Sequence, residues 1–244
     1  MVRRSRTLDL ANGVRARLAS IDPEAVARAL MSGVETATSA RWEAAVQRAA
    51  ALPGDIRPEK LRALSASFAR ELGAVGAAAG MAAATPLVGA GATMMAATVE
   101  LSWFTARAGD LILTIAALHG RPAPTLEERK AWVLAVLIFG STARQGLTAI
   151  ANEAGAGLSE VHPTKLSMVT LRAANNAMSR LVVRRYGTRR GAIALGTALP
   201  LGIGAVVGAG ANVVAIRKLA AQADAFFSKL PYSSIDASSI DITP

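Results

Sequence analysis

The sequence predicts an all-α protein, a helical bundle with two glycine- and alanine-rich helical hairpins that are each broken by a proline. Apolar residues from Val14 onward recur at helical spacing. No segment rich in Val, Ile, Thr and aromatic residues lies between turn signals, so no strand is expected. Two long segments, 72–99 and 191–216, carry no charged residue, and Pro86 and Pro200 lie near their middles.

The first predicted helix begins at Asp22, where aspartate is a good N-cap and the following Pro-Glu pair suits the first helical turn. It is expected to run to about Leu52 and to end at the Pro-Gly pair that follows. The chain then divides into an N-terminal helical arm, residues 1–57, a main helical domain, residues 58–230, and a mobile C-terminal tail, residues 231–244. The arginine-rich start is not followed by an apolar region, so no secretory signal is expected.

Local signals place the ends of the later helices. The helix that begins at Pro58 leads into the first apolar segment, and the chain beyond the proline continues as a helix to Leu118, ending before Gly120. A capping box from Thr125 to the glutamate three residues later opens a helix that runs to Phe139. The remaining expectations are a loop over 151–163, a helix over 164–186 and a last helix that ends around Phe227.

Both apolar segments are predicted to bend at their prolines. As straight helices they would be about 40 Å long, enough to cross the roughly 30 Å hydrocarbon core of a bilayer. The first, however, has few strongly inserting residues, and each proline disfavours the helical conformation of the residue before it. Soluble or shallowly inserted hairpins, deeply re-entrant hairpins and true spans remain open, with bent hairpins favoured. The residues expected to shape and pack the hairpins are Gly76, Gly80, Pro86, Gly89, Gly91, Pro200, Gly204, Gly208 and Gly210.

The composition favours an anionic partner. Lys and Arg number 27 against 17 Asp and Glu, which gives a net charge of +10 and a pI of about 11.1. Nucleic acid, an acidic protein and an anionic lipid surface would each match this charge. Apolar residues make up 52% of the chain but aromatic residues only 4%, so close backbone approach is expected to build much of the core. The absence of cysteine excludes disulfides, thiolate catalysis and Cys-ligated metals.

One helix face carries the best candidate for a polar site. Glu100, Trp103, Arg107 and Asp110 lie at i, i+3, i+7 and i+10, so they share one side of a largely apolar helix. Arg107 is positioned to pair with Asp110 and, more weakly, with Glu100 across two turns. Paired charges inside an apolar bundle can hold a ligand headgroup, but a structural ion pair or a solvated stripe would show the same spacing.

Catalytic and metal-binding motifs are absent from the sequence. The two histidines, His119 and His162, lie far apart, and no zinc site is expected. His119 is expected to end a helix, where the dipole favours it, and it is kept as a candidate ligand-binding residue rather than a base. There is no Gly-x-Ser-x-Gly elbow and no Gly-Lys-Ser/Thr phosphate loop. Neither a cofactor nor an enzymatic activity is therefore expected.

Five arginines precede the second apolar segment: Arg180, Arg184, Arg185, Arg189 and Arg190. A basic rim beside an apolar insert suits an anionic lipid leaflet, where each charge near the surface contributes about 1 kcal/mol. Nucleic acid would use the same charges, but it usually stacks on interleaved aromatic residues, and only Tyr186 is nearby. Anionic lipid is thus the expected partner and nucleic acid is not, while an ordinary solvated helix end remains the alternative.

Three ordered blocks of the sequence resemble the EcsC protein family. They are the glycine-rich block 73–86, the helix through Arg107 that ends at 115–120, and the late glycine-rich block 200–212. The resemblance covers roughly residues 60–230. It implies a helical, membrane-linked bacterial protein of the kind encoded beside an ABC exporter, without an established activity. It also implies that Arg107, His119 and Gly120 match a basic residue and a helix-ending glycine of the family pattern.

We therefore expect a non-enzymatic, membrane-associated protein at the inner face of the bacterial cytoplasmic membrane. The basic rim would bind anionic headgroups, while the hairpins touch or enter the bilayer. The alternative is a soluble carrier that encloses a lipid or other apolar ligand between the hairpins, with the polar stripe holding its headgroup. A homo-oligomer packed through the glycine faces and a membrane-protein partner are compatible with either function.

Overall fold

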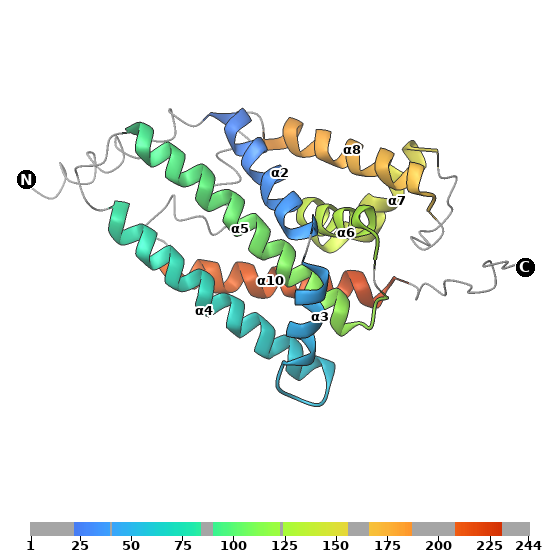
Figure 1. Ribbon diagram of the computed structural model, residues 1–244, viewed down its shortest axis with the longest axis horizontal. Helices are drawn as coiled ribbons and strands as arrows, with labels where there is room; N and C mark the ends of the chain where they lie inside the picture. The colour runs from blue at the N-terminus through green and yellow to red at the C-terminus, as the bar shows by residue number, and fades with distance from the viewer. Residues whose placement is uncertain are drawn as a thin grey trace, which may run out of the picture.

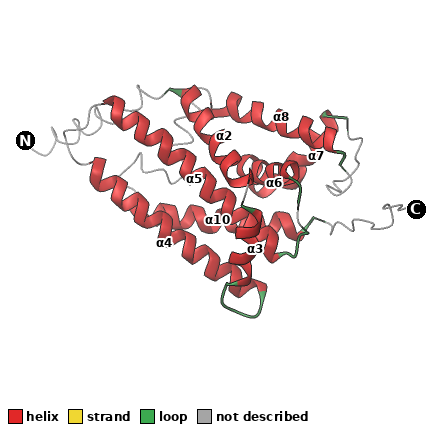
Figure 2. Cartoon of the chain, in the orientation of Figure 1, coloured by secondary structure: helices red, strands yellow, loops and turns green. Residues whose placement is uncertain are grey.

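The computed structural model describes residues 22–39, 41–83, 90–122, 124–155, 166–186 and 208–230. Within these ranges the chain is all-α, as predicted, and contains no strand (Figure 2). The helices are α2 (Pro23–Ser39), α3 (Trp42–Ala50), α4 (Arg57–Ala83), α5 (Ala90–Leu118), α6 (Leu126–Phe139), the 3-10 turn η1 (Gly140–Thr142), α7 (Ala143–Glu153), α8 (Met168–Tyr186) and α10 (Gly208–Ser228).

Helix α5 lies at the centre of the bundle and contacts α2, α3, α4, α6 and α10 (Figure 1). Most of its second half is buried, and Leu111, Ile112, Leu113 and Ile115 are 0% exposed. Burial of that many large apolar side chains is the main stabilising contribution to such a core. Helix α2, part of the expected N-terminal arm, packs along α5 and contributes to the same hydrophobic core.

Small residues let α2 and α5 approach closely. A Cβ placed on Gly33 would collide with the backbone of Ser102 and with Thr105, and one placed on Gly109 would collide with the methyl group of Ala37. Each contact joins α2 to α5. Close backbone approach therefore does build part of the core, as the composition suggested, although at glycines other than those in the apolar hairpins.

The single helix predicted from residue 22 to about 52 was wrong, because the chain interrupts it between α2 and α3. Thr36, Thr38 and Ser39 direct their hydroxyls to carbonyls of the same helix, a local bonding pattern that disfavours helix continuation. Arg41 then adopts a non-helical backbone (φ −111°, ψ 7°). The break orients Trp42 into the core, where its ring meets that of Trp132 edge-on at 6.4 Å.

The first apolar segment bends as predicted. Helices α4 and α5 lie on either side of residues 84–89, contact each other, and run in opposite directions (Figure 1). Residues 84–89 and 187–207 lie outside the described residues, and with them Pro86, Gly89, Pro200 and Gly204. The other hairpin glycines belong to described helices, at positions whose packing is not described: Gly76, Gly80, Gly91, Gly208 and Gly210.

Most helix ends follow the local signals, although α8 begins at Met168 rather than at the predicted residue 164. The capping box is present, with the Thr125 hydroxyl accepting from the Glu128 amide. Gly120 ends α5 in the left-handed region with φ 65°. The loop expected over 151–163 begins later than predicted, because α7, for which the sequence analysis placed no helix, continues to Glu153 before the Ala154–Gly155 turn.

Candidate functional site

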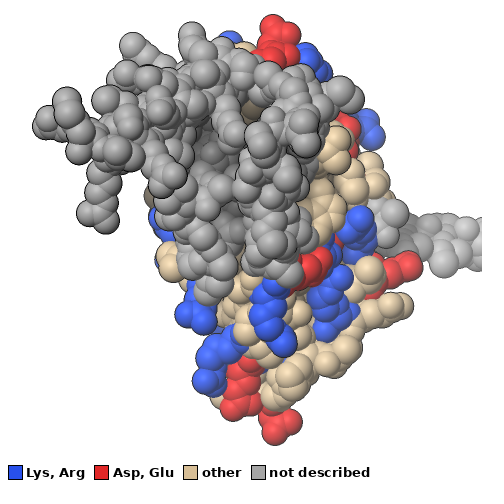
Figure 3. All heavy atoms as spheres, turned by 90° about the vertical axis from the view of Figure 1, so that its left-hand side faces the viewer, with Lys and Arg blue, Asp and Glu red and all other residues tan. Residues whose placement is uncertain are grey.

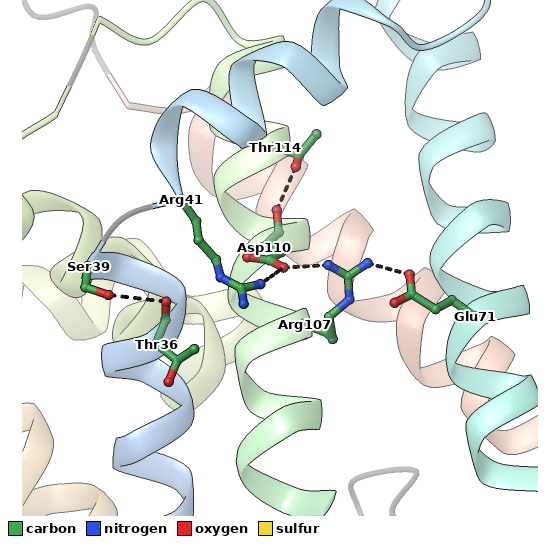
Figure 4. A network of polar contacts seen from close by, with 7 residues as sticks. All are labelled: Thr36, Ser39, Arg41, Glu71, Arg107, Asp110 and Thr114. Carbon is green, nitrogen blue, oxygen red and sulfur yellow. Dashed lines mark hydrogen bonds and ion pairs between the residues drawn. The ribbon is translucent and has the colours of Figure 1, made fainter. Parts of the chain in front are cut away.

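The predicted pair Arg107–Asp110 forms the middle of a partly buried ionic network of four residues: Arg41, Glu71, Arg107 and Asp110 (Figure 4). Arg107 Nη1 donates to Asp110 Oδ2 at 2.6 Å within α5, and Nη2 donates to Glu71 of α4. Arg41, from the α2–α3 junction, donates to the same Asp110 oxygen at 2.7 Å. Sequence reasoning identified the pair within α5 but missed both partners from other helices.

The environment of Arg107 favours its charged form. Burial acts to lower the pKa of Arg107, but the hydrogen bond and charge of Glu71, together with those of Asp110, outweigh it and raise the pKa above its ordinary value. The guanidinium also lies over the Phe68 ring, 4.7 Å from its centroid. Two arginines face two carboxylates, so the network is neutral overall and joins three segments of the bundle.

The other predicted site residues on and after α5 do not join this network in the described structure. Trp103 is partly buried and packs against the core. The side chain of Glu100 lies outside the described residues, so the predicted pairing with Arg107 stays a prediction. His119 is buried at the far end of α5, where it contacts a residue of α10.

His119 belongs to a second polar group, which we call the α10-end cluster: Arg57, His119, Arg121 and Asp224. The His119 Nε2 group donates to Asp224 Oδ1 at 2.8 Å, and Arg57 Nε lies 3.6 Å from the same oxygen. Arg121 Nη2 donates to the carbonyls of Phe227 and Leu230, each at 2.5 Å. These contacts link the start of α4, through Arg57, and the end of α5, through His119 and Arg121, to the end of α10.

The surroundings of His119 disfavour its charged form. Burial lowers the pKa of His119, and the nearby positive charges of Arg57 and Arg121 lower it further. The hydrogen bond and charge of Asp224 oppose this shift without reversing it. The favoured state is therefore a neutral imidazole that donates one hydrogen bond to Asp224. This state suits a structural role for His119.

An apolar cavity lies among α2, α5, α6, α8 and α10, with a volume of about 360 Å³. Its innermost lining includes Val34, Ala108 and Val136, each at most 2% exposed. Two exposed cations, Arg185 of α8 and Lys218 of α10, line it as well. Arg107 and Asp110 are not among its lining residues, so the polar stripe does not face this space.

The predicted basic rim is partly described. Arg180, Arg184 and Arg185 lie exposed near the end of α8, and we call these three the basic cluster. Arg189 and Arg190 lie outside the described residues. Only Arg185 of the cluster also lines the cavity. Among the described residues, no group of three or more metal-ligating side chains is arranged to hold an ion.

Two described segments are long and apolar enough to cross a membrane, Leu101–Leu118 and Leu126–Glu153. Their length and composition are compatible with membrane association. The first, however, is 72% buried within the protein, as a core helix would be. The second is divided into α6 and α7 by Gly140, whose φ of 55° ends α6. Neither coincides with the apolar segments that the sequence analysis singled out.

Comparison with known proteins returned no match to a protein family, to a curated protein or to a solved structure. The resemblance to the EcsC family accordingly stays a prediction based on the three sequence blocks. Assignment of a function to this chain rests on its own geometry.

Proposed function

We propose that this protein is a non-enzymatic, membrane-associated binder of anionic lipid, which uses one end of its helical bundle. The proposal rests on one observation: the ends of the glycine- and alanine-rich helices and the basic cluster lie on the same side of the bundle. Helix α4 finishes there, α5 and α10 begin there, and the last turns of α8, which carry the basic cluster, point toward that side of the bundle (Figure 1). The described parts of both glycine- and alanine-rich segments therefore lie on the side of the bundle toward which α8 directs its arginines.

Exposed apolar side chains accompany the positive charge. Val99, Val183 and Val214 are 69%, 48% and 66% exposed and lie on α5, α8 and α10, in the parts of these helices nearest that end. Figure 3 views the molecule from this side, and on the part of the surface that is described Lys and Arg side chains lie interspersed with Asp and Glu side chains. Apolar side chains beside cations match the boundary between lipid headgroups and acyl chains.

The cytoplasmic leaflet is the surface we propose as partner, because its anionic lipids attract basic segments. Each arginine near such a surface contributes about 1 kcal/mol, so two of them change partitioning about 30-fold. A contribution of this kind weakens with added salt, since exposed charges are screened over about 10 Å at 0.1 M salt. Binding through apolar insertion alone would not show that dependence.

Liposome flotation tests the proposal. The detergent-free protein should float with vesicles that contain phosphatidylglycerol and not with pure phosphatidylcholine, and the double variant R180E/R184E should reduce flotation about 30-fold or more. The matched control is R62E/K229E, which reverses two exposed charges near the opposite end of the bundle. Flotation that ignores lipid charge, or that falls equally in both variants, would refute the proposal.

A further inference from the structure

We infer that the cavity among α2, α5, α6, α8 and α10 binds one molecule of an anionic single-chain amphiphile. The alkyl chain would lie in the apolar interior, and Lys218, with Gln222 one turn further along α10, would hold the acidic headgroup, while Arg185 adds positive charge to the lining. This goes beyond binding to a lipid surface, because it assigns an internal site with its own residues. Its volume of about 360 Å³ is within the range of small-molecule sites.

The lining changes character from the interior to the surface. Its interior is formed by buried apolar side chains from five helices, including Leu30, Val34, Phe104, Val136, Val182 and Ile216. The partly buried Phe139 and Leu219 also line it. Replacement of water by an alkyl chain in this interior is favourable, since neither the chain nor the apolar side chains around it have polar groups that must be desolvated.

The charged lining residues are all positive. Arg185 and Lys218 come from different helices, α8 and α10, and both are exposed. Gln222, one turn further along α10 than Lys218, adds an amide that can donate a hydrogen bond. None of the residues that line this described cavity is an aspartate or a glutamate. A carboxylate or phosphate headgroup complements this set, whereas a cationic or zwitterionic one does not.

Thr105, the hydroxyl residue of the lining, does not alter this polarity. Its side chain donates to the Leu101 carbonyl within its own helix at 2.8 Å. The interior therefore offers no free donor to a polar tail. A ligand with one acidic end and an unbranched apolar body satisfies both parts of the site.

The inference is tested with dansyl-labelled undecanoic acid, whose fluorescence rises in an apolar site, in protein prepared without detergent. The probe should bind, and dodecanoate should displace it at least about tenfold better than dodecanol, the difference expected of a charge-assisted contact. The K218E variant should weaken dodecanoate about tenfold and leave dodecanol unchanged. K229E, which reverses an exposed charge away from the cavity, is the matched control.

A second variant, A215W, places an indole into the cavity from the half-buried Ala215 and should abolish probe binding. Its thermal transition shows whether A215W folds. If A215W does not fold, the test rests on K218E, which changes an exposed side chain. Absence of probe binding by the folded wild type would overturn the inference. Equal displacement by the acid and the alcohol, or binding insensitive to K218E and to a folded A215W, would also overturn it.

Flotation of the same variants separates this inference from the proposed function. A folded A215W that floats normally but no longer binds the probe supports an internal site distinct from the lipid surface. R180E/R184E should show the reverse, with weak flotation and normal probe binding. Dodecanoate and lysophosphatidylglycerol both combine one acyl chain with an anionic headgroup. Probe displacement by dodecanoate but not by lysophosphatidylglycerol identifies a free fatty acid as the source, and displacement by both identifies a single-chain lipid with a phosphate headgroup.

Discussion

Arg41 donates from Nη1 to Asp110 Oδ2 at 2.7 Å, although the two residues are 69 positions apart in the chain. This hydrogen bond joins the α2–α3 junction to α5. Its acceptor, Asp110 Oδ2, also accepts a hydrogen bond from Arg107. Asp110 is only 3% exposed, and within the described residues its other oxygen, Oδ1, has no hydrogen-bond partner. The two arginines therefore share one oxygen of Asp110, and Arg107 donates to Glu71 as well.

Loss of that carboxylate should be costly. D110A is expected to lower the free energy of unfolding by about 3–5 kcal/mol, because it leaves the buried Arg107 with Glu71 alone. R41A should cost only about 1 kcal/mol, since Asp110 keeps its hydrogen bond from Arg107 and the Arg41 side chain is itself 40% exposed. Urea denaturation of both variants measures the two values.

The control for this pair is D55A, which removes an exposed aspartate from the segment before α4. It should change the free energy of unfolding by less than about 0.5 kcal/mol. A D110A protein within about 1 kcal/mol of the wild type would show that the network is not structurally important.

The contact between Gly109 and Ala37 predicts a compensating pair of substitutions. G109A should destabilise by about 1–3 kcal/mol, because its new methyl group would collide with that of Ala37 across the α2–α5 interface. A37G alone should cost about 1 kcal/mol through lost helix propensity. The double variant A37G/G109A moves the methyl group from one helix to the other and should be more stable than the sum of the single effects by at least about 1 kcal/mol.

Thermal and urea unfolding of the four proteins complete this double-mutant cycle. Additive effects would mean that the two helices separate slightly to accept the methyl group. In that case the closeness of α2 and α5 would be a consequence of the packing rather than a requirement for it.

Local signals account for what the sequence predicted well. The capping box at Thr125 and the end of α5 before Gly120 depend on residues within a few positions of each other, and both were predicted correctly. The break near Arg41 was missed because the helical spacing of apolar residues continues through it. Its cause lies in side-chain hydroxyls and in the tertiary contact to Asp110, which periodicity does not register.

The same distinction between local spacing and tertiary packing explains which residues of the candidate sites were predicted. Arg107 and Asp110 were recognised because an i, i+3 spacing on one helix brings them together. Glu71, 36 positions away, and Arg41 reach them only through the packing of other helices. The cavity needs side chains from five helices, and no local pattern in the sequence marks it. Lys218 in particular is an ordinary surface lysine until the packing brings α8 and α10 to line the same cavity.

Arg121 should be a principal stabiliser of the end of α10. R121M keeps the apolar stem but removes both hydrogen bonds to the Phe227 and Leu230 carbonyls, and it is expected to cost about 2–3 kcal/mol. R121K, which keeps the charge but has no planar fork, should lose part of that amount. Urea denaturation measures both. Unchanged hydrogen exchange in the last turn of α10 in R121M would contradict the assignment.

The pH dependence of stability should report His119. Burial and the charges of Arg57 and Arg121 lower its pKa in the folded protein below the unfolded value of about 6.5. The unfolded state therefore binds the proton more readily, and the stabilisation is present above about pH 6.5 and is lost as the pH falls through the folded-state pKa. Urea denaturation at about pH 7.5 and at about pH 5 should show the loss.

H119Q provides the comparison for this measurement, because glutamine keeps a hydrogen-bond donor near Asp224 and does not titrate. Its stability should change less over the same pH interval than that of the wild type. A wild type that gains stability relative to H119Q at the lower pH would mean that Asp224 holds the imidazole charged and that the balance of charges around His119 is the reverse of the one described.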